Sequence, residues 1–478
     1  MRRVALAATL LLACASRPPA PATASPPARF ELRLDPADVH ALRFEARFVG
    51  GRSPKLAIDE DMVPAITRVE VKRGGGWERL EPAKMMAAEC ATDCSVRYTL
   101  DLAKARTSHE GIVTVGPDAY LAPTPTWLMH PSPMPQGSFE LTVENAHPAP
   151  SDRFEPVRFA TGMRRRSAED PSHLVMSTGD FAEGSYAAFG ALRHRLVESA
   201  GGEIELVGFE QPKLALSDDE LATWVREDGE CVAQLYGRFP VARATVFIVP
   251  MQGADEVLFG RVLSMGGASI AALTGTELSV KDTHSDWVLV HEMVHLGFPT
   301  IDGERWIGEG LATYYEPILR TRMGWRTPER TWSGFAHSMH RGVAPAGEQQ
   351  ALDKRSGIDA IYWGGAIYVM MADVGIRVAT GGRMSLDTVL RAVLAQGGDA
   401  TVAWTLDQVI DVADRTTGTK VMSDLRERLA VRGERVDIDA YFAKLGVVPG
   451  SDRYELEAGA EWAAIRDAIT APRSKAEH

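Results

Sequence analysis

The segment His291-Glu292-Met293-Val294-His295 carries more structural information than any other part of this 478-residue chain. Ser285 and Asp286 precede it and Gly297 follows it, and these residue types begin and end helices. The apolar residues between them predict one continuous helix. Positions i and i+4 share a helix face, so both imidazoles can reach one zinc ion while Glu292 lies beside it.

A catalytic zinc site needs a third protein ligand and keeps its fourth position for water. The metzincin pattern places a histidine six residues after the second one, but Ile301 stands there, which excludes that class. Glu309 follows His295 by fourteen residues, and a helix that starts near Gly308 would turn Glu309 toward the metal. The alternative is a surface glutamate, which the helix dipole favours in a first turn.

These motifs resemble the gluzincins, and specifically the M61 glycyl-aminopeptidase-like family. The resemblance is carried by HEMVH, by the following WxxEGLATYY, and by Tyr362-Trp363-Gly364-Gly365-Ala366, which is similar to the family's Tyr-x-Lys-Gly-Ala. Gly364 replaces the lysine, and the link from His295 to Glu309 is shorter than usual. The likeness extends over about residues 30–445 and is strongest at 286–316 and 358–390.

The resemblance implies an α+β multidomain fold with an N-terminal β-sandwich, a thermolysin-like catalytic domain and a C-terminal helical region. It implies one Zn²⁺ per chain, held by His291, His295 and Glu309, and a peptide or protein substrate. Glu292 would take a proton from water and return it to the leaving amine. Tyr362 would donate its hydroxyl to the oxyanion, and the alternative is a purely structural tyrosine.

Two other functions stay open from the sequence. The chain could be a non-catalytic lipoprotein that uses a peptidase-like scaffold for binding, or a zinc hydrolase that acts on a non-peptide amide or ester. Among further candidates, His337 and His340 are interpreted as surface histidines in a loop, and His284 as a residue before the helix. Thr313 could support Glu309 by a hydrogen bond, although helix packing explains it as well.

The first residues have the features of an export signal. Arg2 and Arg3 precede a short apolar run, and Leu11-Leu12-Ala13-Cys14 resembles the lipobox of bacterial lipoproteins. We expect residues 1–13 to be removed, Cys14 to be lipidated, and residues 14–29 to form a Pro/Ala-rich tether. The alternative is an ordinary secretory signal. Lipidation implies attachment to the cell envelope, and the absence of an acidic residue after Cys14 favours the outer membrane.

Composition excludes some functions and leaves the cysteines to be assigned. The chain has 52 basic and 64 acidic residues, a net charge of −12, and no basic stripe, so nucleic-acid binding is not expected. No run of eighteen apolar residues is long enough to span a bilayer. Outside the cytoplasm, Cys90 and Cys94 are expected to form a disulfide, with a metal site as the alternative. Cys231 is expected to be a small buried residue.

Alternating hydrophobicity divides the chain. Period-two runs at 30–34, 42–48, 96–100 and 139–143 predict strands of a β-sandwich over residues 30–150. Strand-like runs at 204–209 and 244–249 belong to a predicted catalytic domain over 151–385. Apolar residues at helical spacing over 366–378 and 386–394 predict helices, and residues 386–478 are expected to form a helical region.

The sequence also bears on whether a free amino terminus is recognised. M61-like aminopeptidases resemble one another in a Gly-Gly-Leu-Glu-His element, whose glutamate can bind the substrate amine. Residues 266–270, Gly-Gly-Ala-Ser-Ile, match this element without a carboxylate. A buried ammonium without an anionic partner is costly. We therefore expect weak aminopeptidase character at most, with Glu277 as a residue that could replace the missing acid.

Overall fold

The computed structural model describes residues 28–38, 40–49, 55–82, 94–108, 111–144, 151–167, 170–451 and 453–472. Cys14 and Cys90 lie outside these residues, as does most of the predicted tether, so the lipidation and the disulfide stay predictions. Cys231 is described, and it is free and fully buried as expected. None of the helices in the described ranges has the length and apolar character needed to cross a membrane.

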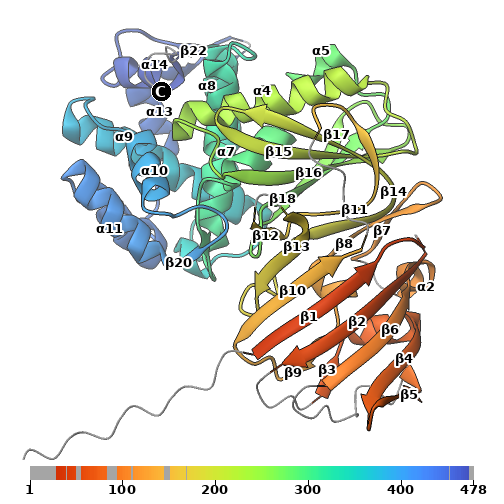
Figure 1. Ribbon diagram of the computed structural model, residues 1–478. Coiled ribbons are helices and arrows are strands. Elements are labelled where there is room, and N and C mark those ends of the chain that lie inside the picture. The colour runs from red at the N-terminus through yellow and green to blue at the C-terminus, as the bar shows by residue number, and fades with distance from the viewer. Residues whose placement is uncertain are drawn as a thin grey trace, which may run out of the picture.

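The N-terminal part of the chain forms an eight-stranded sheet in the order β12-β13-β10-β1-β2-β6-β4-β5 (Figure 1). Its strands are β1 (Ala28–Asp35), β2 (Ala41–Val49), β4 (Ile66–Arg73), β5 (Gly76–Leu80), β6 (Cys94–Asp101), β10 (Gly137–Val143), β12 (Arg164–Ser167) and β13 (Asp170–Ser177). The four strands predicted from alternation are β1, β2, β6 and β10, and they are neighbours in this sheet. β1 begins two residues before Phe30, because Ala28 already pairs with Gly137.

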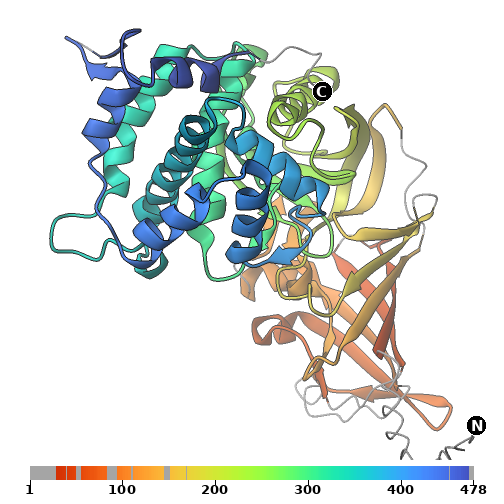
Figure 2. The same ribbon diagram turned by 90° about the vertical axis from the view of Figure 1, so that its left-hand side faces the viewer.

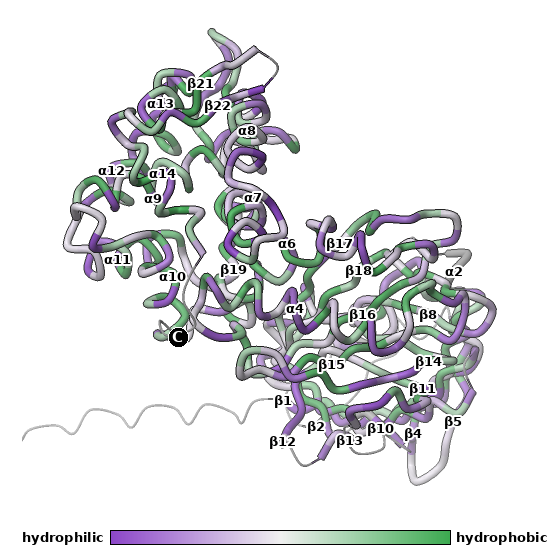
Figure 3. The backbone as a smooth tube through the Cα atoms, turned by 90° about the horizontal axis from the view of Figure 1, so that it is seen from above, coloured by the Kyte–Doolittle hydropathy of each residue, from purple (hydrophilic) through white to green (hydrophobic). Residues whose placement is uncertain are grey.

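A second eight-stranded sheet has the order β17-β18-β16-β15-β14-β8-β7, and β11 pairs with β14. Its strands are β7 (Val113–Val115), β8 (Ala119–Pro123), β11 (Glu155–Thr161), β14 (Tyr186–Ser199), β15 (Gly202–Phe209), β16 (Arg243–Met251), β17 (Val257–Leu263) and β18 (Ser269–Gly275). The strands predicted at 204–209 and 244–249 are confirmed as β15 and β16. β15, β16 and β18 run parallel, and β17 closes the edge in the antiparallel sense. The apolar run of β16 is visible in Figure 3.

Each sheet contains strands from before and after residue 150, and side chains of both sheets form one hydrophobic core. β7 and β8 precede that residue yet belong to the second sheet, whereas β12 and β13 follow it and belong to the first. Trp127 is fully buried and packs its ring against Phe44 of the first sheet and Phe159 and Phe189 of the second. The inner face of the first sheet is therefore covered by strands of the second, and the domain boundary at 150 stays a prediction.

The remainder of the chain is mainly helical, and Figure 2 shows these helices gathered on one side of the sheets. The longer helices are α4 (Asp218–Tyr236), α6 (Val288–His295), α7 (Arg305–Arg322), α8 (Pro328–Ser338), α9 (Gly365–Thr380), α10 (Leu386–Ala395), α11 (Leu406–Thr417), α13 (Ile438–Leu445) and α14 (Ala463–Thr470). The shorter helices of this part are α5 (Val280–Thr283), η2 (Met339–Gly342), η3 (Leu352–Lys354), η4 (Ala360–Gly364), α12 (Val421–Leu425) and η5 (Arg426–Val431). Three short helices lie instead in the N-terminal part of the chain, namely η1 (Glu60–Ala65), α2 (Leu102–Ser108) and α3 (Thr124–Trp127). The helices predicted over 366–378 and 386–394 are confirmed as α9 and α10.

Three short strand pairs complete the fold. They are β3 (Lys55–Ala57) with β9 (His130–Ser132), β19 (Thr300–Ile301) with β20 (Ala403–Trp404), and β21 (Val447–Pro449) with β22 (Tyr454–Leu456). β19 of the second pair lies in the short link between α6 and α7. Its pairing with β20 attaches this link to the segment directly before α11.

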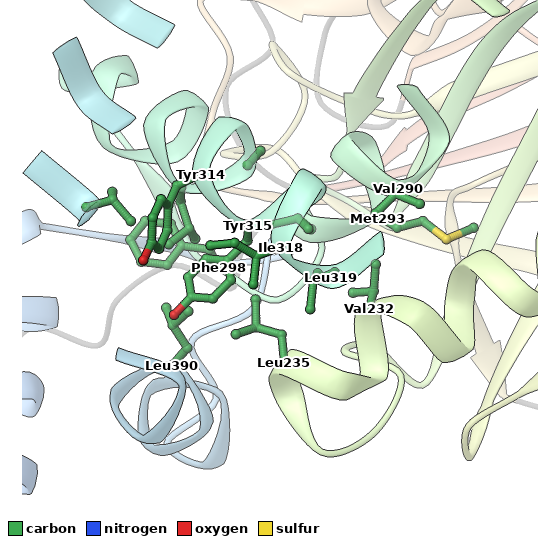
Figure 4. Packing of buried hydrophobic residues seen from close by; sticks show 14 of the residues in the cluster. Val232, Leu235, Val290, Met293, Phe298, Tyr314, Tyr315, Ile318, Leu319 and Leu390 are labelled. Carbon is green, nitrogen blue, oxygen red and sulfur yellow. The ribbon is translucent and has the colours of Figure 1, made fainter. Parts of the chain in front are cut away.

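A continuous apolar core holds α6 between the second sheet and the other helices. Figure 4 shows Val232 and Leu235 of α4 facing Ile318 and Leu319 of α7, with Met293 of α6 in the same cluster. All five side chains are fully buried. Burial of a leucine, valine or methionine side chain stabilises by about 1.5–3 kcal/mol, so the helix that carries the HExxH motif is held in place by apolar contacts.

Candidate metal centre

The start of α6 is fixed by the aspartate that the sequence singled out. The carboxylate of Asp286 accepts hydrogen bonds of 3.1 Å from the backbone N–H groups of Val288 and Leu289. These groups have no acceptor within the helix, so the aspartate caps it. Beyond the end of α6, a β-carbon on Gly297 would lie 2.2 Å from the ring of Tyr236. A glycine is needed there because α4 packs directly against the chain.

The two histidines of the motif lie one turn apart on α6 and face Glu309 of α7. The ring centroids of His291 and His295 are 5.1 Å apart. Glu309 Oε2 is 3.4 Å from His291 Nε2 and 3.6 Å from His295 Nε2, and the glutamate side chain is only 18% exposed. α7 begins at Arg305 and not near Gly308, so Glu309 lies in the second helical turn. The interpretation as a surface glutamate in a first turn is wrong.

The geometry of these three side chains fits a zinc ion. Ligand atoms about 2.0–2.1 Å from a tetrahedral zinc are separated from one another by about 3.3 Å, close to the observed 3.4 and 3.6 Å. Each residue offers one ligand atom, and the three atoms lie within 4.8 Å of one another. Burial opposes ionisation of Glu309, but hydrogen bonds from both histidines hold its pKa well below the usual range. No other such group of three is found in the described ranges.

Glu292 lies on the side of α6 that faces the edge strand β17. It is 8% exposed, and a β-carbon on Gly260 would lie 2.5 Å from its Cγ. The backbone N–H of Val262 hydrogen-bonds to the carboxylate. Burial raises the pKa of Glu292, and the charges of His295 and His291 act in the opposite direction. A carboxylate with a raised pKa is a better proton acceptor near neutral pH.

Tyr362 lies beside Glu309 in the π-helical turn η4, directly before α9. Its ring is nearly parallel to that of His291, with centroids 6.0 Å apart and an interplanar angle of 14°. Burial, the charges of Glu309 and Glu292, and a hydrogen bond to Glu309 raise the pKa of Tyr362 to about 12. The hydroxyl therefore keeps its proton near neutral pH and can donate it in a hydrogen bond. Single π-helical turns often occur at functional sites.

Two glycines bring Tyr362 close to Glu309. A β-carbon on Gly310 would lie 2.2 Å from the backbone of Gly365, and one on Gly365 would lie 1.9 Å from the carbonyl oxygen of Trp306. The backbones of α7 and α9 can therefore touch only because neither residue has a side chain. Gly310 follows Glu309 directly, and Gly365 comes three residues after Tyr362. The contact thus sets the position of the tyrosine relative to the glutamate.

Sequence reasoning missed four residues around the site. They are Gly260, Val262, Trp287 and Arg305. Trp287 is 50% exposed and its ring meets that of His291 edge to face at 5.6 Å, and Arg305 Nη2 is 3.8 Å from Glu309 Oε1. Only Gly260 carried a usable signal, because an isolated glycine inside an apolar strand often marks close backbone approach.

The glycine pair in residues 266–270 serves the sheets. A β-carbon on Gly267 would lie 1.9 Å from the carbonyl oxygen of Gly162, and one on Gly266 would lie 2.7 Å from the sulfur of Met176. Met176 lies in β13 of the first sheet, and Gly162 lies between β11 of the second sheet and β12 of the first. The glycine in contact with Glu292 is Gly260 of β17.

The remaining candidates lie apart from the metal ligands or do not support them. His284 forms an ion pair with Glu227 at 2.8 Å and stacks on Trp325. His337 belongs to α8 and His340 to η2, so the loop expected there is helical. The Thr313 hydroxyl is buried and makes no hydrogen bond within the described part of the chain, and packing is its role.

Comparison with known proteins identifies the fold. No family model and no curated protein matches the chain. An aminopeptidase N family protein from Idiomarina loihiensis is 14% identical with a TM-score of 0.61, over 87% of this chain and 78% of that one. An M1 zinc metallopeptidase from Deinococcus radiodurans is 12% identical with a TM-score of 0.44, over 84% and 93%. The first likeness shows a shared α+β multidomain fold with large sheets and a helical C-terminal region. The M61 assignment stays a prediction.

Proposed function

We propose that this protein is a zinc-dependent metallopeptidase. The observation that carries the proposal is the meeting of His291, His295 and Glu309 within 4.8 Å, with Glu292 beside them. Zinc held by these three residues would polarise a carbonyl and lower the pKa of a bound water. The donor set, two imidazoles and one carboxylate, is the set expected for a catalytic zinc with one open position.

Glu292 and Tyr362 are the two groups that complete such a reaction. Glu292 is suited to accept the proton of the attacking water and deliver it to the leaving amine, since burial raises its pKa. Tyr362 keeps its proton and is suited to stabilise the negative oxygen of the tetrahedral intermediate. The two side chains come from separate elements, α6 and η4, and the charge of Glu292 acts on the Tyr362 hydroxyl.

The edge strand β17 is the surface that an extended peptide would follow. Within the described residues β18 is its one neighbouring strand, so a substrate strand could add to its other edge, where the N–H of Val262 already bonds to Glu292. Leu258 and Phe259 on this strand are 48% and 55% exposed. Gly260 and Val262 contact Glu292, and a chain laid along β17 would pass the metal ligands.

We further propose that the enzyme does not depend on a free substrate amine. The strand next to the metal site, residues 257–263, reads Val-Leu-Phe-Gly-Arg-Val-Leu and contains no carboxylate to bind an ammonium. Matched peptides with free and acetylated N-termini should therefore differ by less than about a hundredfold in kcat/KM, which is about 2.7 kcal/mol. A greater loss on acetylation would establish amine recognition.

Metal analysis and peptide digestion test the proposed function together. The purified protein should contain about one zinc per chain and cleave a peptide library, and a chelator should abolish cleavage until zinc is restored. His295→Ala should lose the metal, whereas substitution of the distant surface residue His337 should not. Zinc-loaded protein that cleaves no peptide would favour the binding scaffold or a non-peptide substrate.

We also propose that Cys14 carries a lipid anchor and that the protein belongs to the cell envelope, at the outer membrane. The support is the Leu11-Leu12-Ala13-Cys14 motif, followed by a stretch rich in proline and alanine. Two or more acyl chains give stable attachment, whereas one is marginal. Palmitate labelling should disappear in Cys14→Ser, and labelling that persists would contradict the anchor.

A further inference from the structure

The chain directly before α6 is held from α7 by one arginine. The guanidinium of Arg320 donates from Nη2 to the carbonyl oxygens of Ser285 at 2.8 Å and His284 at 3.2 Å. These two residues immediately precede Asp286, whose carboxylate caps α6. Trp325, just after α7, donates its N–H to the carbonyl of Arg320 at 2.9 Å and stacks its ring on His284. The end of α7 therefore fixes the point at which the helix of the HExxH motif begins.

Arg320 is buried, and a carboxylate next to it offsets the cost of burying its charge. Its side chain is 7% exposed, and Nη1 donates a 2.5 Å hydrogen bond to Glu316, one turn earlier on α7. An apolar residue could fill the same space, but it could not donate hydrogen bonds to two backbone carbonyls. The contact with α6 is thus directional, and packing alone does not explain it.

The same face of α7 also carries Glu309. Residues that are seven or eleven apart lie within about 20° of one another around a helix axis, so Glu309, Glu316 and Arg320 form one stripe. At one end of the stripe, Glu309 lies 3.4 and 3.6 Å from the two imidazoles of α6. At the other end, about 16 Å along the axis, Arg320 binds the carbonyls before α6. The second contact limits how far the first can change.

We propose that Arg320, supported by Glu316, is a positioning residue of the metal centre, which holds α6 so that its two histidines meet Glu309 at the spacing that zinc needs. The inference rests on the proposed zinc-dependent function and adds to that site a residue that touches neither metal nor substrate. Without Arg320 the start of α6 has more freedom, and zinc binding must order it. Residues that orient metal ligands without touching the metal typically contribute about 10–100-fold to its affinity.

Zinc affinity and unfolding, measured on the same variants, separate positioning from general stability. Arg320→Gln should raise the zinc Kd about 10–100-fold, as measured without denaturant by competition with a chromophoric chelator. It should also lower the urea midpoint of the metal-free protein, because it leaves Glu316 buried without its partner.

The matched control is Arg377→Gln. Arg377 pairs with Asp373 at 3.0 Å, one turn earlier on α9, and its side chain is 8% exposed. The pair therefore has the spacing and burial of the pair between Glu316 and Arg320 but lies on another helix. Its loss should lower the urea midpoint and leave the zinc Kd unchanged.

Cobalt supplies a readout of ligand geometry that does not depend on turnover. The visible absorption of Co²⁺ bound in place of zinc should change in Arg320→Gln and stay as in the wild type in Arg377→Gln. Arg320→Lys keeps the charge beside Glu316 and decides the question if the glutamine variant does not fold. One ammonium cannot reproduce the fork of a guanidinium that binds a carboxylate and two carbonyls, so its zinc Kd should still rise, by about tenfold.

The outcomes distinguish this inference from the proposed function. An unchanged zinc Kd and Co²⁺ spectrum in the Arg320 variants would overturn the positioning role and leave the peptidase proposal standing. An equal rise of the zinc Kd in Arg377→Gln would also overturn it, because any loss of stability would then weaken metal binding. A wild type that binds zinc but cleaves no peptide would overturn the peptidase function, and a rise of the zinc Kd confined to the Arg320 variants would still support the positioning role.

Discussion

Helix α7 belongs to two clusters of ionisable side chains that differ in how their charges are matched. Near its start, Glu309 lies with two imidazoles, and Glu292 lies close by on α6. Glu309 also forms a 3.8 Å ion pair with Arg305, whose side chain is exposed. This cluster combines two carboxylates with two imidazoles, and it has the composition of a site for a cation.

Toward the far end of α7, the buried charged side chains form ion pairs with one another. The guanidinium of Arg322 is fully buried and donates a 2.7 Å hydrogen bond to Asp387, which also accepts one of 2.8 Å from the hydroxyl of Tyr315. Asp373 is likewise paired with Arg377 and accepts a hydrogen bond from a tyrosine, Tyr314. Two arginines thus balance two aspartates.

The comparison teaches that residue type does not mark a functional site by itself. Both clusters are rich in acids and tyrosines, and both lie on the same helix. The charges in the far cluster are paired with one another, which offsets much of the cost of burying them. In the cluster around Glu309, which we call the metal cluster after its proposed role, three possible ligand atoms lie within 4.8 Å of one another, and the one arginine paired with Glu309 is exposed. Substitutions should therefore affect chemistry in one cluster and stability in the other.

The largest effect on activity is expected at Glu292. Glu292→Gln keeps the shape and removes the proton acceptor, so kcat should fall about 10³-fold, or about 4 kcal/mol. Zinc content and resistance to unfolding should stay close to those of the wild type, which metal analysis and a urea titration would show. Retained turnover would remove Glu292 from the mechanism and leave it a structural contact of β17.

The matching experiment in the far cluster is Asp387→Asn. It leaves the charge of Arg322 buried without a counter-ion, and removing one partner of a buried pair costs about 3–5 kcal/mol. The variant should unfold at lower urea concentration while its folded fraction binds the same amount of zinc. An unchanged unfolding midpoint would show that Asn and Tyr315 satisfy the arginine, and a loss of zinc would show that the two clusters are coupled.

A smaller effect is expected at Tyr362, which belongs to the metal cluster but binds no metal in the proposed arrangement. Tyr362→Phe removes one donor to the oxyanion and should lower kcat about 10²-fold with little change in KM. The control is Tyr315→Phe, which removes a hydroxyl from the far cluster and should reduce stability instead. Wild-type kcat in the Tyr362 variant would make that tyrosine structural.

Those features of the fold and of the candidate site that depend on local residue spacing could be predicted from the sequence. The i, i+4 pattern of His291 and His295 and the alternation of the first four strands gave correct elements, because each depends on residues near in the chain. Glu309 was also singled out, and it does lie beside both histidines, although the start of its helix was placed three residues too late. The cap at Asp286 followed from the same local chemistry.

Contacts between distant segments could not be predicted in the same way. Gly310 meets Gly365 and Gly260 meets Glu292 only after the sheets and helices have packed. The strand exchange across residue 150 has the same origin, since β12 and β13 join a sheet whose first strand lies more than a hundred residues earlier. A glycine inside an apolar strand shows that something approaches it, but the sequence does not say what.

The smallest effect is expected at a histidine–carboxylate pair outside both clusters. His340 Nε2 lies 3.4 Å from Asp439 Oδ1, the same spacing as between His291 and Glu309, but the two side chains are 42% and 78% exposed. Water screens such a pair, and exposed ion pairs contribute about 0–1 kcal/mol. His340→Gln should therefore change the free energy of unfolding by less than about 1 kcal/mol and leave zinc content unchanged, whereas His291→Gln should lose the metal. Urea titration and metal analysis on both variants make the comparison. Loss of zinc in His340→Gln would mean that spacing alone, without burial and a third ligand, is enough to hold the ion in this protein.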